Sequence, residues 1–349
     1  MIPLTVPVWQ SQTWQEQLIN VVREPKQLCD MLDLDLPDFL NAHLAALNSQ
    51  QNTEEYQTST TDFPLRVPHS FIQRMKKGDM FDPLLLQVLP QAEELVSVDG
   101  YNTDPLEEED SHKATGIIQK YHGRALIMVA SACAIHCRYC FRRHFPYEDH
   151  RQSKSEWLTA LDSIVKDPTI KEVIYSGGDP LAASDSHLQW LTEQVAQIAH
   201  VKTLRIHTRL PIVIPDRIDD ACLNWLNQSR LKVVMVIHSN HSNEINTDVQ
   251  SALQRLQKAN VLLLNQSVLL KGVNDSADAL CDLSYSLFSS GVLPYYLHVL
   301  DKVKGTHHFD LTADKALAIH ETVKSRLPGY LTPKLSQEIP GKPYKVVLG

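Results

Sequence analysis

The stretch ALIMVASACAIHCRYCF, residues 125–141, joins an apolar run to a loop that carries three cysteines. Residues 125–130 have the length and the aliphatic content of a buried strand. Small and polar residues then end the run, and Cys133, Cys137 and Cys140 follow within eight positions. We therefore expect a strand whose carboxyl end opens directly into a cysteine loop.

Five more apolar runs follow this strand, and their starts are about 30 residues apart, which is typical of strands joined by helical crossovers. The runs span residues 172–175, 203–207, 232–237, 261–264 and 292–299. Segments with helical spacing lie between and after them, at 155–166, 186–199, 216–227, 247–259, 276–289 and 312–326. This alternation predicts a parallel sheet, which right-handed crossovers would form into an open barrel or a doubly wound sheet.

Polar side chains follow the end of every predicted strand. Beyond the cysteines they are Ser176, Gly177, Gly178 and Asp179; His207 and Arg209; His238 and Asn240; Asn265 and Gln266; His298 and Asp301. In parallel α/β folds, catalytic and binding residues collect at this edge of the sheet. Contact with solvent would also make strand ends polar, so position alone leaves both interpretations open.

The cysteine array has the spacing C-x3-C-x2-C. Three thiolates on one tight loop suit three irons of a [4Fe–4S] cube, and the fourth iron then stays open to a small molecule. A zinc site that uses His136 or His144 as the fourth ligand is the alternative, as is a set of buried thiols. The other cysteines, Cys29, Cys222 and Cys281, are scattered and have no such pattern.

The first 115 residues differ from the rest and predict an N-terminal helical domain. Apolar residues recur at helical spacing in 12–22 and 37–49, a short helix is expected at 84–89, and 50–62 is typical of a polar linker. The acidic run at 106–110 is interpreted as a solvated surface.

Charge and composition exclude several classes of protein. The formal net charge is −8, which argues against nucleic acid as a partner, because phosphate binding needs a basic face. No apolar run approaches the ~18 residues of a membrane span. The amino-terminal residues lack a signal-peptide pattern, so we expect a cytoplasmic protein with reduced cysteines.

Six longer motifs occur in order along the chain: CRYCFRRHFPY (137–147), YSGGDPL (175–181), RIHTRLPIVIP (205–215), NHSNEI (240–245), NQSVLLKGVND (265–275) and YYLHVLDKVKGTHHF (295–309). With the cysteine array they resemble the lysine 2,3-aminomutase family of radical S-adenosylmethionine enzymes. The resemblance implies a partial (βα)6 TIM-like barrel at 116–305. It follows an N-terminal helical domain at 1–115 and precedes a C-terminal helix and a pyridoxal-phosphate segment at 306–349.

The same resemblance implies two sets of cofactor-binding residues. Cys133, Cys137 and Cys140 would hold a [4Fe–4S] cluster whose open iron binds S-adenosylmethionine. Ser176, Gly177, Gly178, Asp179, His238 and Gln266 would line the site of that cofactor. The two glycines would also let the backbone approach a ligand closely.

A second cofactor, pyridoxal 5′-phosphate, is implied by the end of the chain. Lys345 matches the lysine that binds it covalently, and Lys120, Tyr121 and Arg124 match the stretch that holds it. Residues so near a terminus are often frayed and exposed, which is the other interpretation of Lys345. Lys342 is its nearby competitor, and it departs from the glycine that the family usually has there.

The substrate implied is L-lysine. Arg142 matches the arginine that binds its carboxylate, a pairing that guanidinium geometry favours. Asp301 and Glu338 match the two acids at the far ammonium, although the family has aspartate at the second position. An N-cap or a loop salt bridge is the structural alternative for Asp301.

The implied activity is an isomerisation of L-α-lysine to (R)-β-lysine, in a branch of the family that supplies β-lysine for the modification of elongation factor P. The implied partners are that factor, its lysyl ligase and a reductant for the cluster. A homo-oligomer is compatible with the sequence, and no zinc is expected. The alternatives are a radical enzyme without pyridoxal phosphate that acts on a peptide or protein, and a non-catalytic metal-binding protein.

Overall fold

The computed structural model describes residues 12–38, 40, 63–108, 112–114, 116–145 and 153–349. The predicted linker at 50–62 and most of the predicted helix at 37–49 lie outside these residues. Within the described part of the chain, no helix is both long enough and apolar enough to cross a membrane.

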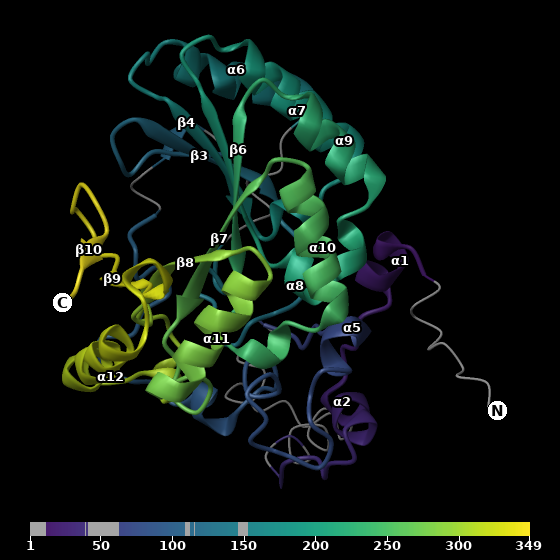
Figure 1. Cartoon of the computed structure of the whole chain (residues 1–349), viewed down its shortest axis with the longest axis vertical. Coiled ribbons are helices and arrows are strands. Elements are labelled where there is room, and N and C mark those ends of the chain that lie inside the picture. Colours follow the sequence, from purple (N-terminus) through teal and green to yellow (C-terminus); the bar gives the residue numbers. More distant parts are fainter. Residues whose placement is uncertain (1–11, 39, 41–62, 109–111, 115, 146–152) are drawn as a thin grey trace, which may run out of the picture.

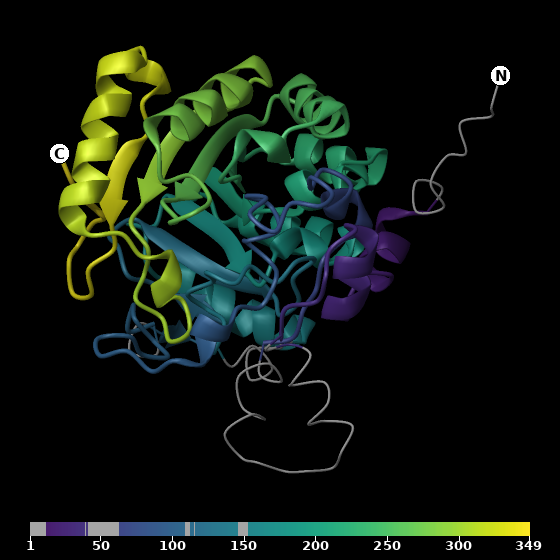
Figure 2. The same ribbon diagram turned by 90° about the horizontal axis from the view of Figure 1, so that it is seen from below.

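One sheet organises the fold, and its strands lie side by side in the order of the sequence. The strands from β3 to β9 are parallel: β3 (Arg124–Ala130), β4 (Glu172–Gly177), β5 (Thr203–Thr208), β6 (Lys232–His238), β7 (Leu262–Val268), β8 (Leu293–His298) and β9 (Lys334–Gln337). Antiparallel strands flank them: β1 (His112–Ala114) and β2 (Ile117–Ile118) at one edge, and β10 (Val346–Val347) at the other. Figure 2 shows the sheet curved into an open barrel.

Six helices cover the outer face of this sheet (Figure 1). They are α6 (Lys154–Val165), α7 (Asp185–Gln197), α9 (Asp220–Gln228), α10 (Thr247–Lys258), α11 (Ala277–Ser289) and α12 (Ala313–Arg326). Each begins at a side chain that accepts a hydrogen bond from a free backbone N–H group of the first turn, which stabilises a helix start. These N-caps are Ser153, Ser184, Asp219, Asn246, Ser276 and Thr312.

Shorter helices connect the strands and form the amino-terminal region. The α-helical ones are α1 (Trp14–Ile19), α2 (Pro25–Met31), α5 (His69–Ile72) and α8 (Leu210–Val213). The 3-10 turns are η2 (Ala92–Leu95), η5 (Pro180–Ala182), η6 (Pro215–Arg217), η7 (Ser242–Glu244), η8 (His307–Phe309) and η9 (Gly329–Leu331). One buried apolar cluster joins the amino-terminal region, with Trp14 and Phe71, to the barrel, with Leu204 and Ile206 of β5.

The structure confirms the predicted partial barrel. All six predicted strands and all six predicted crossover helices are present, with bounds that differ by a few residues. The structure adds β9 as a seventh parallel strand, which pairs with β8 beyond α12. This strand carries the end of the chain onto the edge of the sheet.

The predicted helix at 84–89 is wrong, because these residues form a series of turns. The Asp82 side chain accepts hydrogen bonds from the backbone N–H groups of Leu84 and Leu85, at 2.8 and 3.0 Å. The Gln87 carbonyl then accepts from the backbone N–H of Arg138, at 2.8 Å. The segment therefore supports the cysteine loop through contacts that a regular helix would use internally.

Candidate active site

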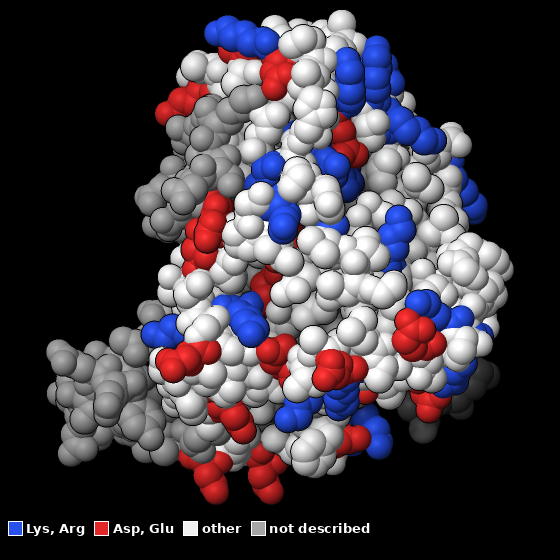
Figure 3. Space-filling model, turned by 90° about the vertical axis from the view of Figure 1, so that its left-hand side faces the viewer, with Lys and Arg blue, Asp and Glu red and all other residues white. Residues whose placement is uncertain are grey.

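A cavity of about 900 Å³ opens at the carboxyl ends of the parallel strands, and every residue that the sequence assigned to the cluster, a cofactor or the substrate lines it. Asn265, another of the polar residues at the strand ends, does not. The cysteines come from the loop after β3, the glycines from the end of β4, and Lys345 from the residue before β10. On the face of the molecule that Figure 3 shows, acidic and basic side chains are interspersed. The barrel thus gathers residues more than 200 positions apart in the sequence around one space.

The three cysteines are free thiols on one wall of the cavity. Burial and the neighbouring Cys137 raise the pKa of Cys140 to about 11, and burial raises the pKa of Cys133 as well. Three thiolates so close together therefore require a cationic partner, which is what an iron–sulfur cluster provides. Among the described residues, no three His, Cys, Asp or Glu side chains form a site for one metal ion. In a cube, by contrast, each cysteine binds a different iron.

Gly177 and Gly178 bring the end of β4 against the cysteine loop. A Cβ atom on Gly177 would lie 2.3 Å from the Ala130 carbonyl oxygen, and one on Gly178 would lie 2.6 Å from that of Ala132. Gly177 also has φ = +122°, a conformation that side chains rarely adopt. Both glycines are therefore needed for the approach of two backbone segments around the cavity.

Asp179 joins the ends of β4 and β5. Its carboxylate accepts hydrogen bonds from the Thr208 hydroxyl at 2.6 Å and from the backbone N–H groups of Arg209 and Leu210 at 2.7 and 3.0 Å. Burial raises the pKa of Asp179, while these donors lower it. The side chain is thus engaged within the protein, and the backbone around it faces the cavity.

A chain of alternating charges crosses the cavity from Arg142 to Lys345. Arg142 Nε and Nη2 lie 2.6 and 2.8 Å from the two carboxylate oxygens of Glu108. Lys120 Nζ lies 3.3 Å from Glu108 Oε1 and 3.2 Å from Glu338 Oε1. Lys345 Nζ lies 2.6 Å from Glu338 Oε2. Each carboxylate is shared by two cations, so the charges of this wall are largely compensated.

The prediction that the acidic run at 106–110 is a solvated surface is wrong for Glu108, because this residue is only 4% exposed. Burial opposes its ionisation, but Arg142 and Lys120 lower the pKa of Glu108 below its usual value. Glu109 and Asp110 lie outside the described residues. A run of four consecutive acids gives no signal of which one turns inward, so sequence reasoning missed Glu108.

The two acids proposed for the far ammonium have different proton affinities. Burial opposes the ionisation of Glu338, but Lys345 and Lys120 together lower its pKa to about 2. Burial raises the pKa of Asp301 to about 7, which outweighs the opposite effect of Lys345. Near neutral pH, of these two acids, Glu338 is therefore ionised and Asp301 titrates.

The remaining predicted residues lie beside this charged wall. The Arg124 guanidinium lies 5.2 Å from the ring centre of Tyr121, and burial together with Glu338 raises the pKa of Tyr121. On the opposite side, His238 Nε2 lies 2.6 Å from Gln266 Nε2. Burial lowers the pKa of His238 to about 3, so its ring is neutral and suited to hydrogen bonding.

Comparisons with known proteins agree with this site. The model of the radical SAM superfamily matches residues 127–283. A protein of Escherichia coli (strain K12) named "L-lysine 2,3-aminomutase" is 47% identical over 337 residues, which cover 97% of this chain and 94% of that protein. Proteins with the same name from Haemophilus influenzae and Buchnera aphidicola are 46% and 44% identical, over 99% and 97% of this chain and 98% and 95% of their own lengths.

The curved parallel sheet, the cysteine loop and the superfamily match together define a radical S-adenosylmethionine enzyme. This class implies a [4Fe–4S] cluster and S-adenosylmethionine. The chain belongs to the lysine 2,3-aminomutase family, whose members it matches along nearly all of its length, and it is an isomerase of the aminomutase type.

Proposed function

We propose that this enzyme uses pyridoxal 5′-phosphate to convert L-α-lysine to (R)-β-lysine. The observation that carries the proposal is the placement of Lys345 in the same cavity as the three cysteines. There its Nζ atom lies 2.6 Å from Oε2 of Glu338, a half-buried carboxylate. The cavity that Lys345 and the cysteines line has a volume of about 900 Å³.

The cysteines fit a cluster because they share one wall and leave its cavity side open. Ser176, Gly177, Gly178, His238 and Gln266 line the same cavity as the cysteines. We assign these residues to the S-adenosylmethionine site. The close backbone packing at the two glycines supports the assignment, since it brings the end of β4 against the cysteine loop beside the cavity.

Lys120, Tyr121 and Arg124 fit the pyridoxal-phosphate site because they supply cations and a ring beside Lys345. A phosphate needs cationic donors, and Lys120 and Arg124 are both within the cavity wall. Glu338 holds the Lys345 side chain at a fixed place, as a lysine that binds a cofactor requires. Lys342 is exposed and does not line the cavity, which favours Lys345 over its competitor.

The proposed substrate contacts lie near the two ends of the chain of charges that runs from Arg142 to Lys345. Arg142 receives the lysine carboxylate, and Asp301 with Glu338 receives the side-chain ammonium. When bound, the cluster with S-adenosylmethionine supplies the radical that removes hydrogen, and pyridoxal phosphate carries the nitrogen that migrates. The protein's own contribution is to orient the substrate between these groups and to exclude water from the cavity.

The product is proposed to serve the β-lysylation of elongation factor P through its lysyl ligase. The relation to the E. coli protein along the whole chain supports the activity, and the partner assignment rests on the motif resemblance. We place the reaction in the cytoplasm, where thiols stay reduced, with an external one-electron reductant for the cluster.

The proposal is tested by anaerobic incubation of the reconstituted enzyme with lysine and S-adenosylmethionine, followed by chiral product analysis. We expect (R)-β-lysine. Protein that carries the cluster but never binds pyridoxal phosphate would instead support a radical enzyme acting on a peptide or protein. Zinc in place of iron and sulfide would support a non-catalytic metal-binding protein.

A further inference from the structure

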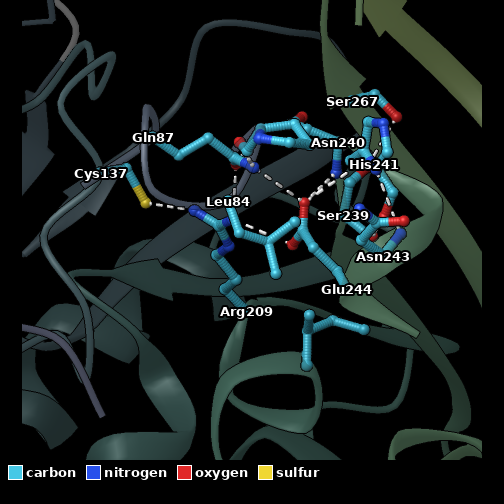
Figure 4. A network of polar contacts seen from close by, with 12 residues as sticks. Leu84, Gln87, Cys137, Arg209, Ser239, Asn240, His241, Asn243, Glu244 and Ser267 are labelled. Carbon is cyan, nitrogen blue, oxygen red and sulfur yellow. Dashed lines mark hydrogen bonds and ion pairs between the residues drawn. The ribbon is translucent and has the colours of Figure 1, made fainter. Parts of the chain in front are cut away.

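Arg209 contacts a cysteine directly, although no role has been assigned to it so far. It follows the end of β5 and is 5% exposed. Its Nη1 atom donates to Cys137 Sγ and to the Tyr139 hydroxyl, each at 2.7 Å. Figure 4 shows the guanidinium pointing toward Cys137 from within a polar network.

The other end of the guanidinium is fixed by buried acceptors. Arg209 Nη2 lies 2.7 Å from Gln87 Oε1 and 3.0 Å from Glu244 Oε2. Glu244 is fully buried, and its second oxygen accepts from the backbone N–H groups of Asn240 and His241 at 2.8 and 3.1 Å. The arginine is therefore tied to the loop after β6 as well as to the cysteine loop.

The main chain and the ring neighbour of Arg209 are fixed as well. The backbone N–H of Arg209 donates to the Asp179 carboxylate at 2.7 Å. The guanidinium carbon of Arg209 lies 5.3 Å from the ring centre of Phe71. The carboxylate of Glu244, the amide of Gln87 and the ring of Phe71 thus hold the guanidinium in place. Such preorganisation allows an N–H donor to keep one direction toward a sulfur atom.

We propose that Arg209 is a positioning residue for the iron–sulfur cluster, which orients Cys137 and raises the reduction potential of the cluster by donating an N–H group to its sulfur. The inference rests on the proposed function to the extent that Cys137 binds the cluster. Reduction adds one electron from an external one-electron donor and makes the cluster more negative. A nearby cation and an N–H donor stabilise that added charge, because hydrogen bonds to the sulfurs are one of the protein's means of tuning the potential.

A purely structural role is the competing explanation. In that case Arg209 holds the loops after β3, β5 and β6 together, and the electronic properties of the cluster do not depend on it. The two explanations differ in one measurable quantity, the midpoint potential, because loss of packing alone lowers stability without removing charge from the sulfur.

The test compares Arg209→Gln with Arg217→Gln in anaerobically reconstituted protein. Arg217 is a matched control, since it is fully buried and its Nη2 lies 2.7 Å from Asp185 Oδ1, but it does not line the cavity. Iron and sulfide are measured first, and the midpoint potential is then determined by reductive titration followed by electron paramagnetic resonance. We expect a more negative potential in Arg209→Gln and the wild-type value in Arg217→Gln.

A wild-type potential in Arg209→Gln would overturn the inference. If that variant does not fold because Glu244 is left unpaired, Arg209→Gln combined with Glu244→Gln removes both charges and takes its place. Its expected shift is still negative but smaller, because the loss of the Glu244 charge acts in the opposite direction. Arg209→Lys, which keeps the charge but lacks the planar fork, should give an intermediate potential. Absence of iron and sulfide from the wild-type protein would instead refute the cluster assignment itself, and with it this inference.

Discussion

Lys345 and Glu338 lie directly opposite each other across the last strand pair, with 2.6 Å between Nζ and Oε2. The antiparallel register of β9 and β10 pairs Val346 with Gln337 and Val347 with Ser336, so Lys345 and Glu338 are the next residues in line. Backbone pairing therefore sets the ion pair. A residue near the terminus is held by the sheet rather than left to fray.

The first prediction concerns the choice between two lysines. Lys345→Ala should abolish covalent trapping of pyridoxal phosphate by borohydride, because the amine that would attach it is gone. Lys342→Ala should leave trapping unchanged, since Lys342 is exposed and outside the cavity wall. Mass spectrometry of the reduced, digested protein checks both variants. A label that persists in Lys345→Ala would show that another lysine binds the cofactor.

The second prediction concerns the acid that sequence reasoning missed. Glu108→Gln leaves Arg142 and Lys120 without their shared buried carboxylate. We expect the free energy of unfolding to fall by about 3–5 kcal/mol, as when one partner of a buried ion pair is removed. Glu107→Gln, at the exposed neighbouring position, should change it by less than about 0.5 kcal/mol. Equal effects in denaturant titrations would contradict the buried role of Glu108.

The third prediction is a pH dependence of substrate binding. The pKa of Asp301 is raised from 3.8 to about 7, so its carboxylate forms only as the pH rises through that value. The KM for lysine should therefore fall as the pH rises from 6 to 8, by up to about tenfold per unit on the acid side. Initial rates across this range check the effect. Asp301→Asn should show a higher KM without this dependence.

Stability gives an independent check on Asp301. A carboxyl whose pKa is raised by folding stabilises the folded state below its unfolded pKa of 3.8, and this contribution is lost as the pH rises toward 7. The melting temperature of Asp301→Asn minus that of the wild type should thus be more positive at pH 8 than at pH 5. An equal difference at both pH values would contradict the raised pKa.

The fourth prediction tests the close packing around the cysteine loop. Gly178→Ala places a methyl group against the Ala132 carbonyl, whereas Gly329→Ala meets no atom within 4 Å, and neither glycine has a positive φ. We expect Gly178→Ala to lose most of its iron and sulfide after reconstitution, because the loop must move to admit the methyl group. Gly329→Ala should load like the wild type, and normal loading of Gly178→Ala would refute the argument.

Sequence reasoning works best here where local pattern and global fold agree. The runs that became β4 to β8 are aliphatic and regularly spaced, so their neighbours in sequence are also their neighbours in the sheet. β9, with the sequence KLSQ, has no such pattern, and only its pairing with β8 makes it a strand. The turns at 84–89 likewise depend on a contact with a distant segment, the bond from Arg138 to the Gln87 carbonyl.

In the active site too, some residues could be predicted from local sequence patterns and others could not. The lining residues that were predicted follow strand ends or match motifs, both of which are local signals. The partners of those residues were not found, because Glu108, Gln87 and Glu244 precede or follow the strands in segments without periodicity. Their burial comes from the cations they meet, and charge pairing across the fold leaves no mark in the order of the residues.

The strand order has a further consequence for catalysis. The cysteine loop follows β3 and Lys345 precedes β10, near opposite edges of one sheet, and only the curl of the sheet brings them around a common space. The curvature of the sheet therefore fixes the distance between the cysteine loop near one edge and Lys345 near the other. β6, whose Met235 and Val236 are buried, lies between these two edges. A change in the curvature of the sheet would alter this distance while every residue of the site kept its own chemistry.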